Sequence, residues 1–189
     1  MNNKQLGMSL VELMVAMVIS LLLILGVTEL FSRTSVSDRA NTELARMQES
    51  GRVALEIIGQ DARRAGFQGC VASDTRTAFP GGGTLPDDAV SSTANTNVTF
   101  RYATPGSGCK TVALNFEPAI TYANAGGSIT RNGDPVLDNA SMQVSFAPAN
   151  NAVTANSINI QITVSDSRAS SEALSNRTFS GTYELRNRL

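Results

Sequence analysis

The residue with the most unusual chemistry is Glu12, an acid in the otherwise apolar run GMSLVELMVAMVISLLLILGV at residues 7–27. A carboxylate at the centre of a lipid bilayer costs about 2.5–3.5 kcal/mol on the insertion scale, so it usually has a functional role and a partner. Where water is excluded, opposite charges attract strongly and a lone charge is left uncompensated. The run therefore predicts a functional role and a partner for Glu12.

The only two cysteines, Cys70 and Cys109, are a candidate disulfide. Both lie beyond the apolar run, on the side expected to face an oxidising compartment, where paired cysteines are common. Closing a loop of about forty residues stabilises the folded chain by roughly 4 kcal/mol in the chain-entropy model. We expect the two cysteines to pair, with two separate buried thiols as the alternative.

Other reactive chemistry lacks its usual residues. The chain has no histidine, which removes imidazole from acid–base catalysis and metal binding, and its net charge of −1 gives no electrostatic case for nucleic acid. The pair Asp87-Asp88 has no third acid spaced for a calcium site, and no base accompanies a serine. The sequence predicts a protein that is not an enzyme, with no cofactor, no metal site and no specific nucleic-acid partner.

A long helix must position Glu12. Residues 8–28 cover roughly 30 Å as a helix, the thickness of a bilayer's hydrocarbon core, and Lys4 favours a cytoplasmic amino terminus. Two alternative interpretations of this apolar segment are a removable secretory signal and a plain membrane anchor. The apolar run is not followed by a small-residue cleavage site, and a proline-free, helix-compatible sequence continues to Ala65.

The second half of this helix carries an apolar stripe at intervals of three and four residues, the period of one buried helix face. Its members are Leu44, Met47, Gly51, Leu55, Ile58, Ala62 and Ala65. The charged residues between them, Asp61 included, are predicted to form a solvated face. Gly66 and Gly69 are expected to end the helix, which gives a predicted helix over residues 8–65.

Residues 66–189 are predicted to form a β-rich domain. A polar, glycine-rich loop at residues 71–97 is a candidate for partner contact, with an inert solvated loop as the alternative. Beyond it, apolar and polar residues alternate as in half-buried strands. The alternating sets lie at residues 98–102, 112–116, 120–122, 142–146, 158–164 and 179–185. The predicted fold class is α+β, with the helix packed against one meandering antiparallel sheet.

The segment Gly7-Met8-Ser9-Leu10-Val11-Glu12 resembles the processing site of type IV pilins and the related pseudopilins. The resemblance implies a type IV pilin-like fold and a leader at residues 1–7 that prepilin peptidase removes after Gly7. It also implies that Met8 is then N-methylated, and that Glu12 attracts the amino-terminal amine of a neighbouring subunit in the growing filament.

A resemblance to the PilW-type minor pilins runs nearly from end to end of the chain. It is carried by residues 8–31, the AGFQGC step at residues 65–70, the DNASMQV segment at residues 138–144 and the ending at residues 185–189. This resemblance implies a low-abundance subunit that helps initiate assembly of a type IV pilus and is placed near its tip, in a system that supports twitching motility. Its implied partners are other minor pilins, the major pilin, prepilin peptidase, the inner-membrane assembly platform and, before assembly, the lipid bilayer.

The implied location is the bacterial inner membrane, with the carboxy-terminal domain in the periplasm, followed by the extracellular pilus. Two alternatives stay open from the sequence. A minor pseudopilin of a type II secretion system shares the processing site and Glu12. A membrane-anchored periplasmic adhesion or binding domain would need neither leader removal nor a partner for Glu12.

Overall fold

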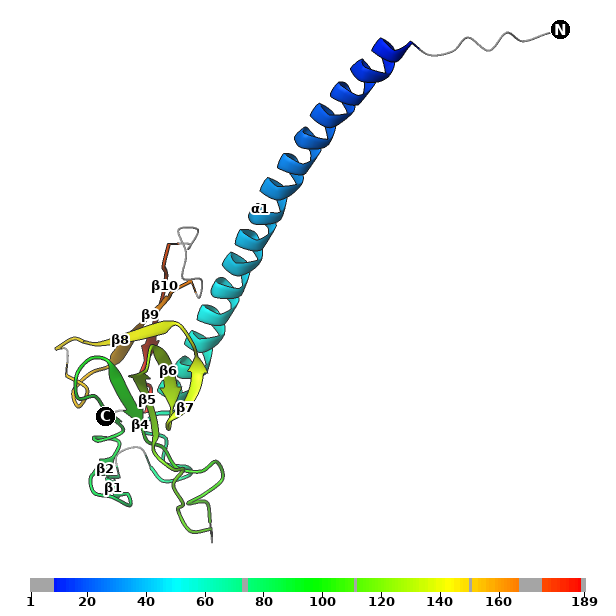
Figure 1. Ribbon diagram of the computed structural model, residues 1–189. Helices are drawn as coiled ribbons and strands as arrows, with labels where there is room; N and C mark the ends of the chain where they lie inside the picture. Colours follow the sequence, from blue (N-terminus) through cyan, green and yellow to red (C-terminus); the bar gives the residue numbers. More distant parts are fainter. Residues whose placement is uncertain (1–8, 73–74, 111, 150, 167–174, 188–189) are drawn as a thin grey trace. The chain divides into compact units, whose positions relative to one another are not determined.

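The computed structural model of the 189-residue chain describes residues 9–72, 75–110, 112–149, 151–166 and 175–187. The chain forms two compact units, Met1–Leu44 and Ala45–Leu189 (Figure 1). Both contain part of helix α1, Leu10–Arg64, where the sequence predicted a helix over residues 8–65. The predicted leader, with Gly7 and Met8, lies outside the described residues.

The end of α1 is fixed by contacts from distant parts of the chain. Gly66 takes a φ of +82°, which an L side chain rarely adopts, and its N–H donates to the carbonyl of Arg101 at 2.9 Å. The Asn187 side-chain amide lies 3.2–3.4 Å from the carbonyl oxygens of Arg63, Arg64 and Ala65. These are carbonyls that the helix itself leaves unpaired. The carboxy-terminal segment therefore caps the long helix.

A five-stranded antiparallel sheet forms one part of the second unit, in the order β3-β4-β5-β6-β7 (Figure 1). Its strands are β3 (Val90–Ser91), β4 (Asn97–Phe100), β5 (Ile120–Ala125), β6 (Ser128–Arg131) and β7 (Asp134–Leu137). Two-residue turns join β5 to β6 and β6 to β7. The turn residues Gly126-Gly127 and Asn132-Gly133 all have positive φ, the combination that suits the twist of a tight hairpin.

A second antiparallel sheet has the order β10-β9-β8, and its three strands, β8 (Ala140–Ala147), β9 (Ser157–Val164) and β10 (Arg177–Glu184), are eight residues each. Four even-numbered residues of β9, residues 158–164, are buried as the alternation predicted. A small sheet pairs β1 (Thr77–Ala78) with β2 (Thr84–Leu85). The α+β class is confirmed, but the prediction of one meandering sheet is wrong.

Backbone bonds connect the two larger sheets along β8. The N–H of Ala140 donates to the Gly127 carbonyl at 2.9 Å, and the N–H of Val144 donates to the Asn95 carbonyl at 2.7 Å. Between them, the side-chain amide of Asn124 both accepts from the Met142 N–H at 2.8 Å and donates to the Met142 carbonyl at 2.9 Å. One edge of β8 thus bonds to the β3–β4 connection, to strand β5 and to the β5–β6 turn of the five-stranded sheet.

Two further expectations differ from the structure. Residues 112–116 alternate in polarity but form no described strand, and only an isolated bridge joins Phe116 to Ala103. The segment at residues 71–97, expected as a loop, contains the short strands β1, β2 and β3, and it buries Leu85, Ala89 and Val90 completely. Burial of these side chains explains why part of a polar, glycine-rich segment is ordered against the core.

The apolar stripe of α1 is confirmed as the helix face that packs on the sheets. Met47, Gly51, Leu55, Ile58 and Ala62 are buried, and Leu44 at the start of the stripe is half-buried. The stripe joins β-strand residues in one hydrophobic core.

Two glycines of the stripe allow strand β10 to lie close to the helix. A Cβ added at Gly51 would overlap the ring of Phe179, and one added at Gly59 would overlap the ring of Tyr183. The spacings match, because eight helical residues rise about 12 Å and four strand residues span about 13 Å. The Tyr183 hydroxyl donates to the Leu55 carbonyl at 2.9 Å. The guanidinium group of Arg63 lies over the Tyr183 ring, with its carbon 5.4 Å from the ring centroid.

Replacing Gly59 by alanine is expected to lower the free energy of unfolding by about 1–3 kcal/mol, the usual cost of overpacking. The added Cβ overlaps a ring that cannot move without losing its bond to Leu55. Urea unfolding of the full chain in detergent micelles measures the change.

The control for this variant is Gly26→Ala, because a Cβ at Gly26 meets nothing within 4 Å. This variant is expected to keep its stability or to gain up to about 1 kcal/mol from helix propensity. Equal unfolding free energies for the two alanine variants would show that Gly59 is not needed for the close approach of Tyr183.

Candidate functional site

The first candidate site is the start of helix α1, where Glu12 lies in the first turn. The carbonyl of Ser9 accepts the N–H of Leu13 at 3.1 Å, so Ser9 stands at the amino-terminal boundary of the helix. The Glu12 side chain is exposed, and no ion pair or hydrogen bond joins it to another described residue. Its carboxylate is therefore available to a partner outside the described chain.

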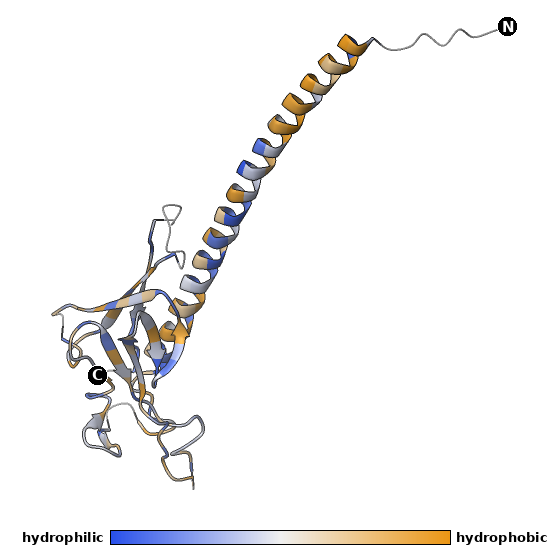
Figure 2. Ribbon diagram, in the orientation of Figure 1, coloured by the Kyte–Doolittle hydropathy of each residue, from blue (hydrophilic) through white to orange (hydrophobic). Residues whose placement is uncertain are grey.

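The helix surface around Glu12 is apolar and uncovered (Figure 2). Between Leu10 and Phe31 the large apolar side chains have exposed fractions from 45% at Leu13 to 76% at Phe31. This stretch is long and apolar enough to cross a membrane, and none of its most apolar window is buried within the protein. An apolar surface of this extent requires lipid or another protein to cover it.

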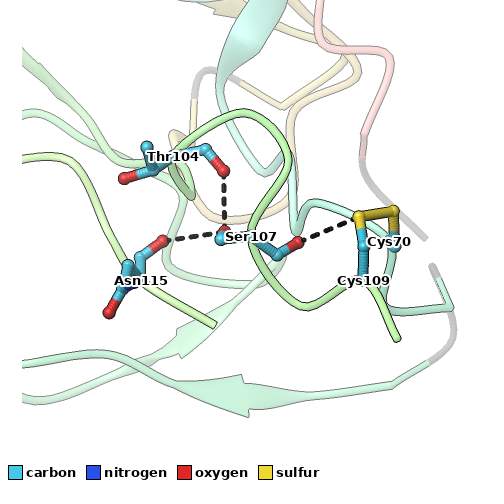
Figure 3. Close-up of a disulfide and its surroundings, with 5 residues drawn as sticks. All are labelled: Cys70, Thr104, Ser107, Cys109 and Asn115. Atoms are coloured by element: carbon cyan, nitrogen blue, oxygen red, sulfur yellow. Dashed lines mark hydrogen bonds between the residues drawn. A yellow bond between two sulfur atoms is a disulfide. The ribbon is translucent and has the colours of Figure 1, made fainter. Parts of the chain in front are cut away.

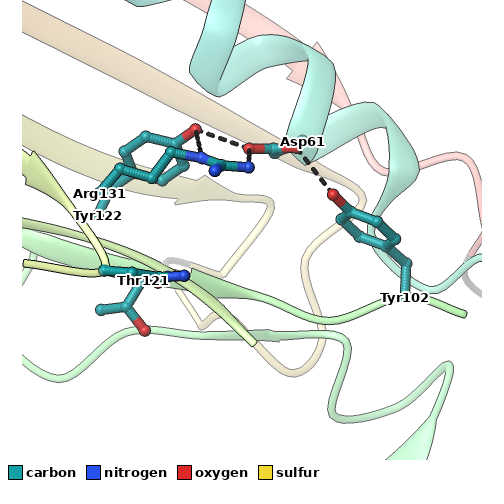
Figure 4. A network of polar contacts seen from close by, with 6 residues as sticks. Asp61, Tyr102, Thr121, Tyr122 and Arg131 are labelled. Atoms are coloured by element: carbon teal, nitrogen blue, oxygen red, sulfur yellow. Dashed lines mark hydrogen bonds and ion pairs between the residues drawn. The ribbon is translucent and has the colours of Figure 1, made fainter. Parts of the chain in front are cut away.

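A second candidate site is a buried polar network around Asp61, on the second half of α1 (Figure 4). The Asp61 carboxylate accepts hydrogen bonds from Tyr122 at 2.6 Å and from Tyr102 at 3.0 Å. A guanidinium nitrogen of Arg131 lies 3.3 Å from the same carboxylate, and the Arg131 Nε donates to the Tyr122 hydroxyl at 3.0 Å. Because Tyr122 and Arg131 belong to β5 and β6, the network ties the helix to the five-stranded sheet.

The sequence predicted that Asp61 lies on the solvated face of the helix. This prediction is wrong, since Asp61 is only 4% exposed. Asp61 follows buried Ile58 by three residues and precedes buried Ala65 by four, which is the spacing of one helix face. This spacing is the signal that could have identified it. A buried carboxylate is retained when each oxygen has a donor, and the two tyrosines and Arg131 supply them.

The network favours neutral tyrosines. Burial raises the pKa of Tyr122 above its ordinary value of 10.0, and the hydrogen bond and negative charge of Asp61 raise it further. The pKa of Tyr102 is raised for the same reasons, with burial again the largest cause. Burial also raises the pKa of Tyr183, with a smaller contribution from Glu56. A neutral phenol keeps its proton and can donate it to a carboxylate. The two hydrogen bonds to Asp61 therefore help to hold the helix against the rest of the second unit.

The predicted disulfide is present in the structure and joins Cys70 to Cys109 (Figure 3). The N–H of Cys70 also donates to the Ser107 carbonyl at 3.2 Å, and the Ser107 hydroxyl lies 2.6 Å from the Thr104 carbonyl. The second contact of this hydroxyl is the Asn115 carbonyl, at 3.2 Å. The covalent link therefore attaches the segment that follows α1 to an internally bonded loop at residues 104–115.

A cleft with a volume of about 580 Å³ adjoins the end of α1. Its lining includes Arg64, Phe67, Tyr102 and Glu117. In the described ranges, no group of three histidine, cysteine, aspartate or glutamate side chains is placed to hold a metal ion. Asp87 of the acidic pair instead forms an ion pair with Arg76 at 2.6 Å.

Comparison with known proteins gives one finding, at the amino terminus. The family model described as the prokaryotic N-terminal methylation motif matches residues 2–28. This motif is the signal of type IV pilins and pseudopilins, and it supports a pilin-like protein. No curated protein and no solved structure matches the chain. The long helix with antiparallel sheets is consistent with a pilin-like fold.

Replacing Tyr122 by phenylalanine is expected to cost about 1.5–3 kcal/mol of stability, because it removes a hydrogen bond to a buried charge. It should also weaken the pH dependence at alkaline pH. Tyrosines of the unfolded chain ionise near pH 10, whereas the raised pKa of Tyr122 keeps it neutral in the folded chain. The free energy of unfolding therefore falls as pH rises above about 10, and less steeply in the variant.

Urea unfolding of the full chain in micelles between about pH 8 and about pH 11 tests this prediction. The control is Tyr183→Phe, which deletes a hydroxyl that donates to a neutral carbonyl and is expected to cost about 0.5–1.5 kcal/mol. Equal losses in the two variants would argue against a charge-assisted role for the Asp61 network.

Proposed function

We propose that this chain is a structural minor pilin subunit that helps initiate assembly of a type IV pilus and is incorporated into it. The observation that carries the proposal is the methylation motif at residues 2–28, with Glu12, which pairs with no described residue, in the first turn of an exposed apolar helix. The motif implies processing by prepilin peptidase and assembly with other pilins. Structural subunits, not enzymes, carry this motif.

The proposed sequence of events begins in the inner membrane. Residues 8–28 span the bilayer, residues 1–7 are the cytoplasmic leader, and residues 66–189 form the periplasmic domain. Prepilin peptidase cleaves between Gly7 and Met8, and the new amine of Met8 is methylated. Such processing removes Lys4 and leaves a charged amine close to an apolar helix, which is the cation that a buried carboxylate requires.

Glu12 then supplies the pairing that positions a neighbouring subunit. Its carboxylate has no described partner within this chain, and it lies on a helix whose surface is available to other subunits. In the apolar interior of a filament, the amine of one subunit and Glu12 of the next are each costly alone and favourable together. The pair would fix the axial stagger between the two helices.

The position near the pilus tip and the minor rank rest on the resemblance to PilW-type minor pilins at residues 65–70, 138–144 and 185–189. The second candidate is a minor pseudopilin of a type II secretion system, because the methylation motif is common to both classes. Deletion of the gene distinguishes them. Loss of pili and twitching with secretion intact supports the minor pilin, and loss of secretion with pili intact supports the pseudopilin.

Mass spectrometry of the protein from its native cells is expected to show a mature chain that begins at N-methylated Met8. The reason is the match of residues 2–28 to the methylation motif. Cells that lack prepilin peptidase provide the control, and there the chain should still begin at Met1. A chain that begins at Met1 in both strains, or that is cut beyond the apolar run, would contradict the proposal.

Glu12→Ala is expected to leave membrane insertion intact and to lower recovery in sheared filaments by about tenfold, the equivalent of losing roughly 1.4 kcal/mol per contact. The cause is the loss of the carboxylate that pairs with the amine. Quantitative blotting of membrane and filament fractions measures this effect.

The matched control is Glu29→Ala, which removes an exposed acid from the same helix that is already paired with Arg33 at 2.7 Å. This control variant should be recovered like the parent chain. Equal recovery of the Glu12 variant and the parent would remove Glu12 from the assembly contact.

A further inference from the structure

The strand edges of the second unit differ in how their backbone groups are satisfied. One edge of β8 bonds to Gly127, Asn124 and Asn95. Strands β1, β2 and β3 have only two residues each, and edge strand β7 has four, including Pro135, with an irregular register against β6. Short strands, proline and irregular pairing are common ways to protect an edge. The remaining edge strand, β10, has eight residues and none of these features.

The register of β10 shows which of its backbone groups point outward. The N–H of Leu185 donates to the carbonyl of Asn156 at 2.8 Å, and the same register continues along the strand as Tyr183 opposite Ile158 and Phe179 opposite Ile162. In an antiparallel pair, bonded residues alternate with residues whose backbone groups face away. The outward residues are therefore Thr178, Ser180, Thr182 and Glu184, and all four are exposed.

No described residue bonds to the outward backbone groups of these four positions. Within the described ranges, these positions place four N–H donors and four carbonyl acceptors without a partner in one row along the edge. Two side chains of the strand, Phe179 and Tyr183, pack on the helix at Gly51 and Gly59. Because this packing already orders the strand, an edge of this length with no described partner binds an extended chain at a low entropic cost.

We propose that the free edge of β10 pairs with an extended strand of a neighbouring filament subunit. The inference rests on the proposed function, which places other subunits beside this chain. Backbone groups along an edge are satisfied by another strand, whereas a lipid or nucleic-acid surface cannot present the alternating N–H and C=O groups. The exposed side chains beside the edge are three hydroxyls and one carboxylate, so specificity depends on polar or β-branched side chains of the partner strand.

Amide hydrogen exchange of the full chain tests this pairing with an internal control. In micelles, the amides of Ser180 and Thr182 are expected to exchange at least about tenfold faster than those of Phe179 and Tyr183, which are bonded to β9. In assembled filaments the even-numbered amides become as slow as the odd-numbered ones. Slow exchange of both sets in micelles would show that the chain's own segment covers the edge, and fast even-numbered amides in filaments would show that it stays free. Either result overturns the proposal.

Ser180→Pro tests the edge by mutation, because it removes an outward donor and no ladder bond. The expected result is a loss in filament recovery of about tenfold, with normal leader cleavage and an unchanged urea midpoint in micelles. Ser180→Thr keeps the N–H and the hydroxyl and should be recovered like the parent. Parent-like recovery of Ser180→Pro overturns the edge contact alone. Absence of the parent chain from filaments overturns both the edge contact and the proposed function.

Discussion

The constraint on which this protein depends is the apolar surface of α1 that the described residues leave exposed. Large side chains from Leu10 to Phe31 remain exposed, while the buried part of the helix begins near Met47. The two halves of the helix therefore need different surroundings: the first half requires lipid or another protein, and the second half packs on the chain's own sheets. The proposed function agrees with this division, since a filament subunit of the kind proposed would need both a membrane-compatible helix and a folded domain.

The second half of α1 is held by contacts of different chemistry that reinforce each other. Two glycines of the helix leave room for the Phe179 and Tyr183 rings of β10. Asp61 accepts hydrogen bonds from Tyr122 and Arg131 of the five-stranded sheet, and the Asn187 side chain caps the last carbonyls of the helix. The packing at Gly51 and Gly59 sets how closely the helix and strand approach. The Asp61 bonds fix rotation about the helix axis, since a carboxylate turned away from its donors would be buried without a partner. The second half of the helix is therefore an integral element of the second unit.

The sequence predicted the features that depend on local periodicity or composition. The helix, its apolar stripe, its end before Gly66 and the alternating strands at residues 142–146 and 158–164 follow directly from side-chain spacing. Apart from the disulfide and the packing of the helix stripe on the strands, contacts between distant residues could not be predicted. The alternation at residues 112–116 is compatible with a strand and with an extended loop. Only pairing with a neighbouring strand distinguishes the two, and here a single bridge joins Phe116 to Ala103. The division into two sheets likewise depends on long-range bonds such as Asn124 to Met142.

The placement of the aromatic hydroxyls makes the chain a reporter of its own folding. The sequence contains three tyrosines and no tryptophan, and each tyrosine donates a hydrogen bond to helix α1: Tyr102 and Tyr122 to Asp61, and Tyr183 to Leu55. Intrinsic ultraviolet fluorescence therefore originates almost entirely at the helix–sheet boundary. Detachment of the domain from its helix, whether in detergent, in lipid or within a polymer, would change that emission without any introduced label.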